Sequence, residues 1–371
     1  MSSQSTAAEP LTAAQENERD EFADHVVQAT SHALEVFSIY LGLRLGYYTA
    51  LRDGPLTVSA LAERSGTARR YAREWLEQQA SAGILHVDNP LATPEMRRFA
   101  LPAAQAEVLA DTESLNYLAP LAQLVAGVVH PLPTILAAYR SGGGVPFAAY
   151  GADLREGQAS INRTMFLRQL GPEWLPQLPD VHARLLAQPP AHVADIGSGA
   201  GWSSIGMARS YPSIRVDGFD LDEESVQLAR LNAAGAGVSH RARFSTRDAG
   251  EITLAGQYDL VTAFECLHDM AQPVAVLQVM RQLAGPTGAV LVMDEKVGDT
   301  FLGPDSSLDS LMYGWSILHC LPVGKAEEPS AETGTVMRTA TFMRYAQDAG
   351  FSRVEVTPIQ HPFFRFYRLY S

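Results

Sequence analysis

The chain has 371 residues, of which 46% are hydrophobic and 19% charged, and its formal net charge is −13. At about 100–200 residues per domain, this length predicts two or three globular domains. So acidic a chain repels nucleic acid phosphates and anionic membrane surfaces, and neither is expected as a partner. Two cysteines exclude a disulfide scaffold, and no signal peptide or long apolar run is visible, so we expect a cytoplasmic protein.

The N-terminal part reads as a tail followed by a small helical domain. Residues 1–20 are rich in Ser, Ala, Gln and Glu, which predicts a disordered tail. A helix that ends at Gly66 is followed by a second helix and by two short strands, 84–87 and 98–101. This order predicts a mostly α-helical, winged helix-turn-helix domain over 21–110.

Residues 111–188 are expected to form a helical linker or lid. Within it, Asp153 and Glu156 have the spacing of a capping box and predict a helix start. A Gly-Pro pair at 171–172 predicts the end of that helix. The glycine-rich run 141–146 before it is expected to be a flexible joint.

From His192 onward, strands alternate with helices, which predicts a parallel sheet and an α/β, Rossmann-like domain over 189–371. Residues 299–337, between the fifth and sixth strands, are expected to be an insertion over the substrate site. The expected strands are 193–196, 215–219, 243–246, 260–263, 289–293, 354–357 and 364–369.

A glycine-rich segment lies between the first of these strands and the following helix. It reads Asp195-Ile-Gly197-Ser-Gly199-Ala-Gly201. Glycines permit a left-handed turn and close approach of a ligand, and the helix N-terminus offers unpaired N–H groups. The dinucleotide fingerprint is G-x-G-x-x-G, whereas the spacing here is G-x-G-x-G. The variant favours a ligand without a phosphate, whose amino-acid end packs on the loop.

Two acids follow at the ends of the next strands. Asp220 ends the second strand, 25 residues after Asp195, and is predicted to bind ribose hydroxyls. The alternative is a helix N-cap, a role that Asp222 fills better. Asp248 follows the third strand and is predicted to accept a hydrogen bond from an adenine amino group, with a solvated loop charge as the alternative.

With these residues in place, the chain resembles the class I S-adenosylmethionine (SAM) dependent methyltransferases. From about residue 25 it is similar to bacterial small-molecule O-methyltransferases, particularly an actinobacterial group, through the segments 150–158, 264–269 and 313–322. The resemblance implies SAM as cofactor, S-adenosylhomocysteine (SAH) as product, no metal, and a role in secondary metabolism. It also implies that the winged-helix domain forms a homodimer rather than binding DNA.

The resemblance assigns the parts of SAM to particular residues. The methionine end is expected on the glycine segment, the ribose at the tip of the second strand and the adenine near the third strand. The cofactor-binding residues implied or predicted are Asp195, Gly197, Gly199, Gly201, Asp220, Leu221, Asp248, Ala249 and Phe264.

Methyl transfer from a sulfonium is an in-line displacement that depends on alignment, and a hydroxyl acceptor also needs a base. His268 follows the fourth strand and has a suitable side chain. With Asp269 it resembles the His-Asp pair of plant-type O-methyltransferases, whose histidine is the base, although Met270 replaces the tryptophan that commonly follows. The alternative is that the pair only begins the next helix, with Asp269 as its N-cap. Glu265 would lie near the sulfonium and could orient SAM or substrate or only hydrogen-bond the backbone, so it is given no specific role.

Two segments are expected to line the substrate site. The apolar stretch 311–321 offers Tyr313, Trp315 and His319, and the earlier helix offers Asn162 and Phe166. The alternative for these residues is core packing.

Other functions are weighed against O-methylation. A carbon or nitrogen acceptor is one alternative. A SAM-responsive DNA-binding regulator is another, since Arg69, Arg70 and Arg73 lie on the second helix of the N-terminal domain, but Glu74 and Glu77 share that helix.

Overall fold

The computed structural model describes residues 11–248, 257–304 and 308–371. The chain forms two compact units, Met1–Asp111 and Thr112–Ser371, which are described separately. The segment predicted as a helical linker or lid therefore belongs, from Thr112 onward, to the same unit as the sheet.

The first unit begins with the long helix α1 (Ala13–Arg44). A capping box starts it: Gln15 N donates to Thr12 Oγ1, and Thr12 N donates to Gln15 Oε1. The expectation of disorder up to residue 20 is therefore wrong for residues 13–20. Composition suggested a tail, but the Thr-x-x-Gln spacing is a local helix signal that outweighs it.

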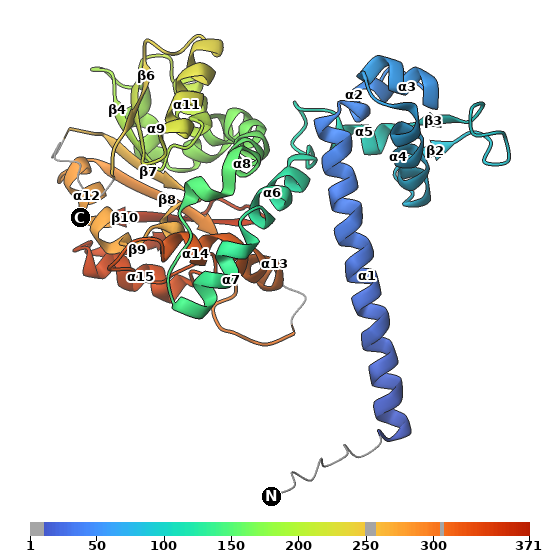
Figure 1. Ribbon diagram of the computed structural model, residues 1–371. Coiled ribbons are helices and arrows are strands. Elements are labelled where there is room, and N and C mark those ends of the chain that lie inside the picture. Colours follow the sequence, from blue (N-terminus) through green and yellow to red (C-terminus); the bar gives the residue numbers. More distant parts are fainter. Residues whose placement is uncertain (1–10, 249–256, 305–307) are drawn as a thin grey trace, which may run out of the picture. The chain divides into compact units, whose positions relative to one another are not determined.

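The rest of this unit follows the predicted order of two helices joined by a turn and then two short strands (Figure 1). The turn follows Gly66, whose φ of 65° caps the first helix of the pair in the left-handed region. The strands form an antiparallel sheet in the order β1-β3-β2, whose first strand is an addition to the prediction. The elements are α2 (Tyr47–Leu51), β1 (Leu56–Thr57), α3 (Val58–Ser65), α4 (Arg69–Ser81), β2 (His86–Val87), β3 (Arg98–Ala100) and α5 (Ala103–Leu109).

The second unit begins with helices α6 (Pro120–Val129), α7 (Leu132–Ser141) and α8 (Gly151–Met165). The run 141–146 is not a free joint, because Val145 is fully buried and its N–H donates to Pro322 O at 2.8 Å. No single helix among the described residues is long and apolar enough to cross a bilayer, and α6 with α7 meets that test only as a pair bent by 53°.

Helix α8 does not end at 171–172 as expected. It continues as a π-helix, Phe166–Trp174, with Pro172 inside it. Proline lacks the N–H of a regular helical bond, and the wider π turn accommodates its ring. The helix also begins differently: its N-cap is Tyr150, and the predicted capping pair Asp153 and Glu156 instead accepts hydrogen bonds from Gln123.

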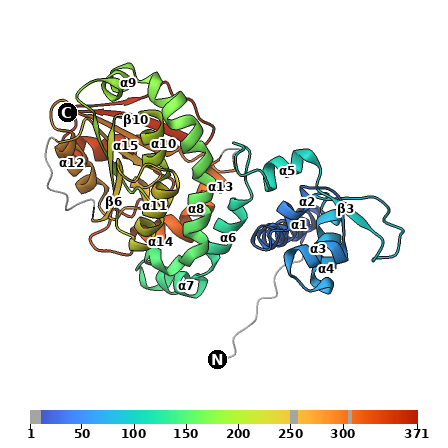
Figure 2. The same cartoon turned by 90° about the horizontal axis from the view of Figure 1, so that it is seen from above.

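The sheet has the order β6-β5-β4-β7-β8-β10-β9, and β10 is antiparallel to both its neighbours (Figures 1 and 2). The strand order reverses between β4 and β7, and ligands of open α/β sheets bind at the carboxyl edge of such a point. The predicted strands are confirmed to within two residues at either end. They are β4 (His192–Ile196), β5 (Arg215–Asp220), β6 (Ala242–Thr246), β7 (Leu260–Phe264), β8 (Ala289–Glu295), β9 (Arg353–Val356) and β10 (Phe364–Tyr370).

Helices cover both faces of this sheet and bury two apolar layers. One layer includes α9 (Pro179–Leu186), α10 (Trp202–Ser210) and α11 (Glu223–Gly235), and the other includes α12 (Pro273–Ala284) and α15 (Thr339–Asp348). Between β8 and α15 lie α13 (Asp309–Trp315), the π-helix Ser316–Cys320 and α14 (Leu321–Gly324).

Candidate active site

The glycine turn after β4 has the geometry that its sequence predicts. Gly197, Gly199 and Gly201 have φ values of 65°, 49° and 81°, which side chains other than glycine rarely adopt. A Cβ on Gly197 would lie 2.6 Å from Cys266 Sγ, so this residue has no room for a side chain. The turn therefore lies directly against the end of β7.

Asp195 supports this turn from inside the protein. Its Oδ2 accepts hydrogen bonds from the hydroxyls of Ser203 and Ser204 at 2.5 and 2.7 Å, and its Oδ1 accepts one from Thr262 at 2.7 Å. The residue is 1% exposed, and burial raises the pKa of its carboxyl. Asp195 thus ties the turn to α10 and β7, and its place beside the methionine end of SAM stays a prediction.

Asp220 fixes the glycine turn from the tip of β5. Its Oδ2 accepts a hydrogen bond from Gly199 N at 2.7 Å, and its Oδ1 accepts one from Asp222 N at 2.9 Å. The N-cap of α11 is Asp222, which accepts from Ser225 N, so the capping alternative for Asp220 is wrong. The predicted ribose-binding acid thus lies against the turn predicted to hold the methionine end.

The neighbouring adenine candidates lie at the same edge. Leu221 follows Asp220 and is 60% exposed. Asp248 follows β6 on an exposed stretch of backbone. Ala249, also predicted to contact the cofactor, lies outside the described residues.

Glu265, the first residue after β7, has an unusual conformation. Its φ is 54°, although it is not a glycine, and its N–H donates to Met293 O at 2.9 Å. Its Oε2 accepts hydrogen bonds from Gln158 Nε2 at 3.0 Å and Asn162 Nδ2 at 3.1 Å, both on α8. Its Oε1 is buried and has no hydrogen-bond partner among the described residues. Burial raises the pKa of this carboxyl to about 7.

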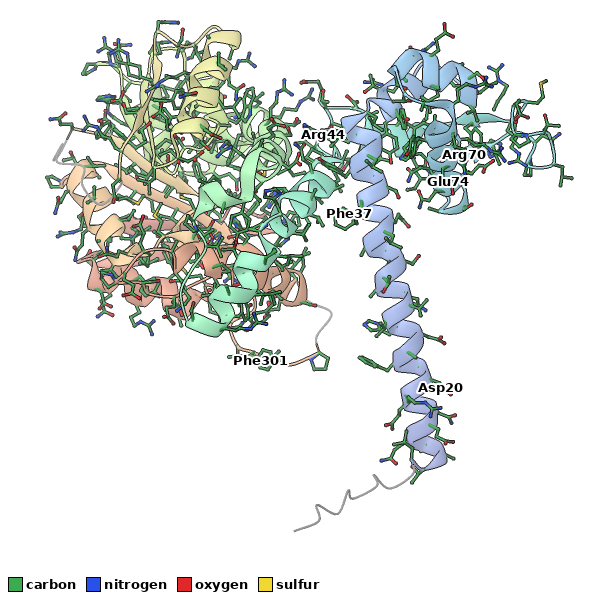
Figure 3. All side chains as sticks on the ribbon, in the orientation of Figure 1. Asp20, Phe37, Arg44, Arg70, Glu74 and Phe301 are labelled. Carbon is green, nitrogen blue, oxygen red and sulfur yellow. The ribbon has the colours of Figure 1, made fainter. Side chains whose placement is uncertain are left out.

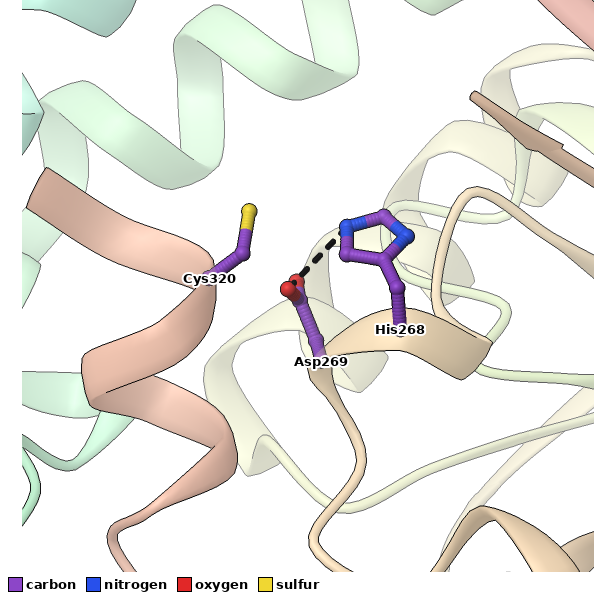
Figure 4. Close-up of side chains that lie close together, drawn as sticks. All are labelled: His268, Asp269 and Cys320. Carbon is purple, nitrogen blue, oxygen red and sulfur yellow. Dashed lines mark ion pairs between the residues drawn. The ribbon is translucent and has the colours of Figure 1, made fainter. Parts of the chain in front are cut away.

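His268 lies 2% exposed among three carboxylates. Its Nδ1 donates to Asp294 Oδ1 at 2.7 Å and lies 2.9 Å from Glu295 Oε2, while its Nε2 is 3.1 Å from Asp269 Oδ1 (Figure 4). Burial lowers the pKa of His268, but the three carboxylates outweigh burial and hold it well above the ordinary value. Burial likewise raises the pKa of Asp269, but the charge of His268 outweighs it and brings that pKa to about 2.

His268 is therefore held as an imidazolium at neutral pH. A base must begin with a free nitrogen lone pair, and here both nitrogens face anions. The role of His268 as base stays a prediction, and it requires that Nε2 lose its proton and its contact with Asp269. Asp269 is not the N-cap of the next helix either, since that position is Gln272.

The sequence spacing predicts no metal site, yet the fold brings metal-ligand atom types together here. Cys320 lies across from His268 and Asp269 (Figure 4), and the three ligand atoms lie within 4.8 Å of one another, as do those of His268, Asp294 and Glu295. Because the carboxylates already pair with the imidazolium, we describe His268, Asp269, Asp294 and Glu295 as the ion-pair cluster.

The predicted substrate residues divide between site and core. Asn162 reaches Glu265, and His319 packs edge-on against Tyr150 with a ring-centroid distance of 4.6 Å. Burial lowers the pKa of His319, so its ring is neutral, and its Nε2 has no partner among the described residues. Phe166 packs on Phe264 in the core beneath the site.

The other two substrate candidates, Trp315 and Tyr313, do not contact the ion-pair cluster. Trp315 packs against the apolar residues of α6, α7 and α8, as the core-packing alternative expected. Tyr313 accepts a hydrogen bond from Arg338 at 3.3 Å and lies edge-on to Phe301, a residue that is exposed on the segment after β8 (Figure 3).

Sequence reasoning gave Glu265 no specific role, and it missed the pair Asp294–Glu295. A signal for the pair was available, because the apolar run Ala289–Met293 ends in two acids at the carboxyl edge of the sheet. For Glu265 no local pattern predicts the left-handed backbone or the reach to α8.

Comparison with known proteins agrees with this geometry. Residues 188–343 match the model of a family described as "Methyltransferase domain". Ubiquinone biosynthesis O-methyltransferases from Azoarcus sp. (strain BH72) and Aeromonas salmonicida (strain A449) are 27% and 32% identical over 165 and 126 residues, which is 44% and 34% of this chain. The matched stretches span 66% and 51% of those relatives, less than two thirds of their length.

Solved structures match nearly the whole chain. Human N-acetylserotonin methyltransferase in complex with SAM has a TM-score of 0.70 at 17% identity and covers 98% of this chain and 99% of its own. The mitomycin 7-O-methyltransferase MmcR has a TM-score of 0.68 at 19% identity and covers 97% and 100%. At such identity these likenesses establish the fold.

Together, the family match, the strand order and the glycine turn identify a class I SAM-dependent methyltransferase domain. The fold of nearly the whole chain is that of the matched methyltransferase structures.

Proposed function

We propose that the protein transfers the methyl group of SAM to a hydroxyl of a small molecule. The observation that carries the proposal is the hydrogen bond from Gly199 N to Asp220 Oδ2, which joins the glycine turn to the acid at the tip of β5. In this arrangement the methionine end of SAM packs on Gly197, Gly199 and Gly201, and Asp220 receives the ribose hydroxyls. The adenine then lies between Leu221 and the segment that begins at Asp248, with Phe264 beneath the turn.

The names of the matched relatives support a hydroxyl acceptor. The curated relatives are ubiquinone biosynthesis O-methyltransferases, and one of the solved structures is a mitomycin 7-O-methyltransferase. Carbon and nitrogen acceptors have no comparable support among them. We also propose a role in secondary metabolism, which the name of the mitomycin 7-O-methyltransferase supports, and a cytoplasmic location, which rests on the sequence alone.

Two features of the first unit bear on partners. Val27, Leu34 and Leu41 are exposed at seven-residue spacing along α1, which supports a homodimer formed through this helix. On α4, Arg70 pairs with Glu74 (Figure 3) and Arg73 with Glu77, so phosphates would have to displace existing ion pairs. This arrangement disfavours the DNA-binding regulator.

Two measurements test the proposal. Calorimetry on the folded protein should show binding heat for SAM and SAH, and isotopically labelled methyl from SAM should appear in a hydroxylated compound when the protein is incubated with a metabolite pool. A protein that binds neither nucleoside would refute the proposal. Binding of SAM with label appearing only on carbon or nitrogen would refute the hydroxyl acceptor alone.

Asp220→Asn should weaken SAM binding at least about tenfold, because the amide has one acceptor oxygen where the carboxylate uses two, for Gly199 N and Asp222 N. Asp217→Asn is the matched control. This residue is on the same strand but bonds His192 and Tyr258, three residues before the strand's carboxyl end, and should leave SAM affinity unchanged. Equal affinities for both variants in calorimetry would contradict the assignment.

A further inference from the structure

A buried arginine of α8 reaches the acids at the tip of β5. Arg155 is 8% exposed, and it donates two hydrogen bonds to Asp222, from Nε to Oδ2 at 2.7 Å and from Nη2 to Oδ1 at 3.2 Å. Its Nη1 lies 2.6 Å from Glu224 Oε2. Two parallel hydrogen bonds between a guanidinium and a carboxylate fix the orientation of both groups, which a single point charge does not. The pair therefore fixes the position of Asp222.

Asp222 links this arginine to the predicted ribose-binding acid. Its backbone N–H donates to Asp220 Oδ1 at 2.9 Å, and its side chain caps α11 by accepting from Ser225 N at 2.8 Å. The other oxygen of Asp220 accepts from Gly199 N. Each carboxylate oxygen can accept a second hydrogen bond, so both oxygens of Asp220 can still receive a ribose hydroxyl. The two backbone donors fix the plane of the carboxylate, and one of them belongs to Asp222.

The charges at this tip also require a cation. Asp220, Asp222 and Glu224 place three carboxylates within five residues. Burial raises the pKa of the Asp220 carboxyl, and the negative charge of Asp222 raises it further. The guanidinium of Arg155 pairs with the other two acids and is close enough to interact electrostatically with Asp220. It thus offsets a repulsion that would otherwise favour a protonated Asp220.

The spacing of two contacts on α8 matches the spacing of the strands beneath it. Arg155 reaches Asp222 just after β5, and Asn162, seven residues later on the helix, reaches Glu265 just after β7. Seven residues of an α-helix rise about 10 Å and return to the same face. Strands β5 and β7 are separated by β4 and so lie about 10 Å apart. Helix α8 therefore runs across the carboxyl end of β4, where the glycine turn begins.

Close packing holds α8 in this position. A Cβ on Gly127 of α6 would lie 2.5 Å from Leu154 N on α8. Where α8 continues as a π-helix, a Cβ on Gly206 of α10 would lie 2.4 Å from Phe166 O. Backbones packed this closely resist displacement. Arg155 thus extends toward β5 from a helix that is fixed on two sides.

We infer that Arg155 orients Asp220 toward the ribose hydroxyls of SAM, acting through Asp222. The inference rests on the proposed function, because it requires the ribose at the tip of β5. Arg155 is a positioning residue, since its guanidinium is already used by the neighbouring acids. Without it, Asp222 loses the partner that fixes it, and the Asp220 carboxylate loses the orientation that lets both hydroxyls bind. The loss concerns the ribose, whereas contacts to the adenine and the methionine end do not depend on this pair.

Arg155→Met tests the assignment, with Arg184→Met as the matched control. Arg184 makes the same two-bond pair with Asp259, which lies just before β7 at the opposite edge of the sheet. Calorimetry measures the affinity for SAH and for SAH analogues that lack the 2′- or the 3′-hydroxyl of the ribose. The wild type should bind SAH at least about tenfold more tightly than either analogue. In Arg155→Met this preference should shrink to about threefold or less, whereas Arg184→Met should retain it.

Two further variants test the route through Asp222. Asp222→Asn can still cap α11 and keeps its backbone N–H, but it offers the guanidinium only one acceptor oxygen. Combined with Arg155→Met, it should weaken SAH binding by no more than about twofold beyond Arg155→Met alone. Arg155→Lys keeps the charge without the two-bond geometry, so its preference for SAH should also fall below that of the wild type. This variant carries the test if Arg155→Met does not fold.

Three results would overturn the inference. An unchanged preference for the ribose hydroxyls in Arg155→Met or Arg155→Lys would show that Arg155 only stabilises the fold. Losses of affinity that add in the double variant would exclude the route through Asp222. Equal wild-type affinities for SAH and both analogues would leave Arg155 with no ribose contact to orient. Failure of the wild type to bind either SAM or SAH would instead refute the proposed function.

Discussion

Individual carboxylates in this protein differ in how their burial is compensated. Asp195 accepts three hydroxyl hydrogen bonds, and Asp294 pairs with the imidazolium of His268, whereas Glu265 accepts two amide hydrogen bonds from α8. A buried charge is tolerated only when partners replace the lost water. Burial raises the pKa of Glu265 to about 7, whereas at Asp294 the charge of His268 outweighs burial and lowers the pKa.

Asp195→Asn should lower the free energy of unfolding by about 1–3 kcal/mol. The amide nitrogen is a hydrogen-bond donor, and it would face a hydroxyl that now donates to the carboxylate. Ser204→Ala is the milder comparison, since it removes one of the three bonds. Thermal unfolding should rank the variants in this order, and an unchanged Tm for Asp195→Asn would contradict it.

His268 should make stability depend on pH above neutrality. Its pKa is raised in the folded protein, so its contribution is complete below the unfolded value of about 6.5 and is lost as pH rises through the folded value. The Tm difference between the wild type and His268→Gln should therefore shrink as the pH is raised from about 6 to 10. A constant difference would show that His268 is not held as an imidazolium.

At the scale of the element, the π-helix Ser316–Cys320 follows from the proline after it. Pro322 has no N–H to donate to Leu318 O, its partner in a regular helix. Instead, the hydroxyl of Tyr150 donates a hydrogen bond to Leu318 O at 2.9 Å, and the hydroxyl of Tyr139 donates one to Ile317 O at 3.1 Å. Side chains from a distant segment thus stabilise a helix that its own sequence interrupts.

Tyr150→Phe should destabilise the second unit by about 1–3 kcal/mol, because it leaves a carbonyl without its donor in a buried setting. Tyr139→Phe removes the equivalent bond on the exposed side, where water replaces the hydroxyl, and should cost less. Chemical denaturation compares the two variants. Equal losses of stability in the two variants would contradict the prediction, because they would show that burial does not make the Tyr150 hydrogen bond more stabilising.

At the scale of the whole molecule, α1 leaves apolar side chains exposed at the seven-residue spacing of a helix-pairing seam. Leu34→Glu should therefore shift the proposed homodimer toward monomer, as measured by analytical ultracentrifugation. Leu231→Glu on α11 is the matched control, since the two leucines are 63% and 71% exposed. A wild type that sediments as a monomer would refute the proposed dimer.

Much of the second unit could be predicted from sequence because its signals are local. Buried parallel strands read as apolar runs, and the glycine turn reads as a spacing, so both follow from a few adjacent residues. The ends of helices were less well predicted. Pro172 appeared to end a helix that tertiary packing instead continues as a π-helix.

The sequence by itself determined the α/β class, the glycine turn, Asp220 as the acid at its side and the winged-helix order of the first unit. Only the tertiary structure decided the chemistry at the site. Whether His268 is a free base or an imidazolium depends on Asp294 and Glu295, which come from another strand, and the free oxygen of Glu265 depends on amides from α8. Protonation is set by the charges and burial around a group, and these are fixed only when distant segments pack together.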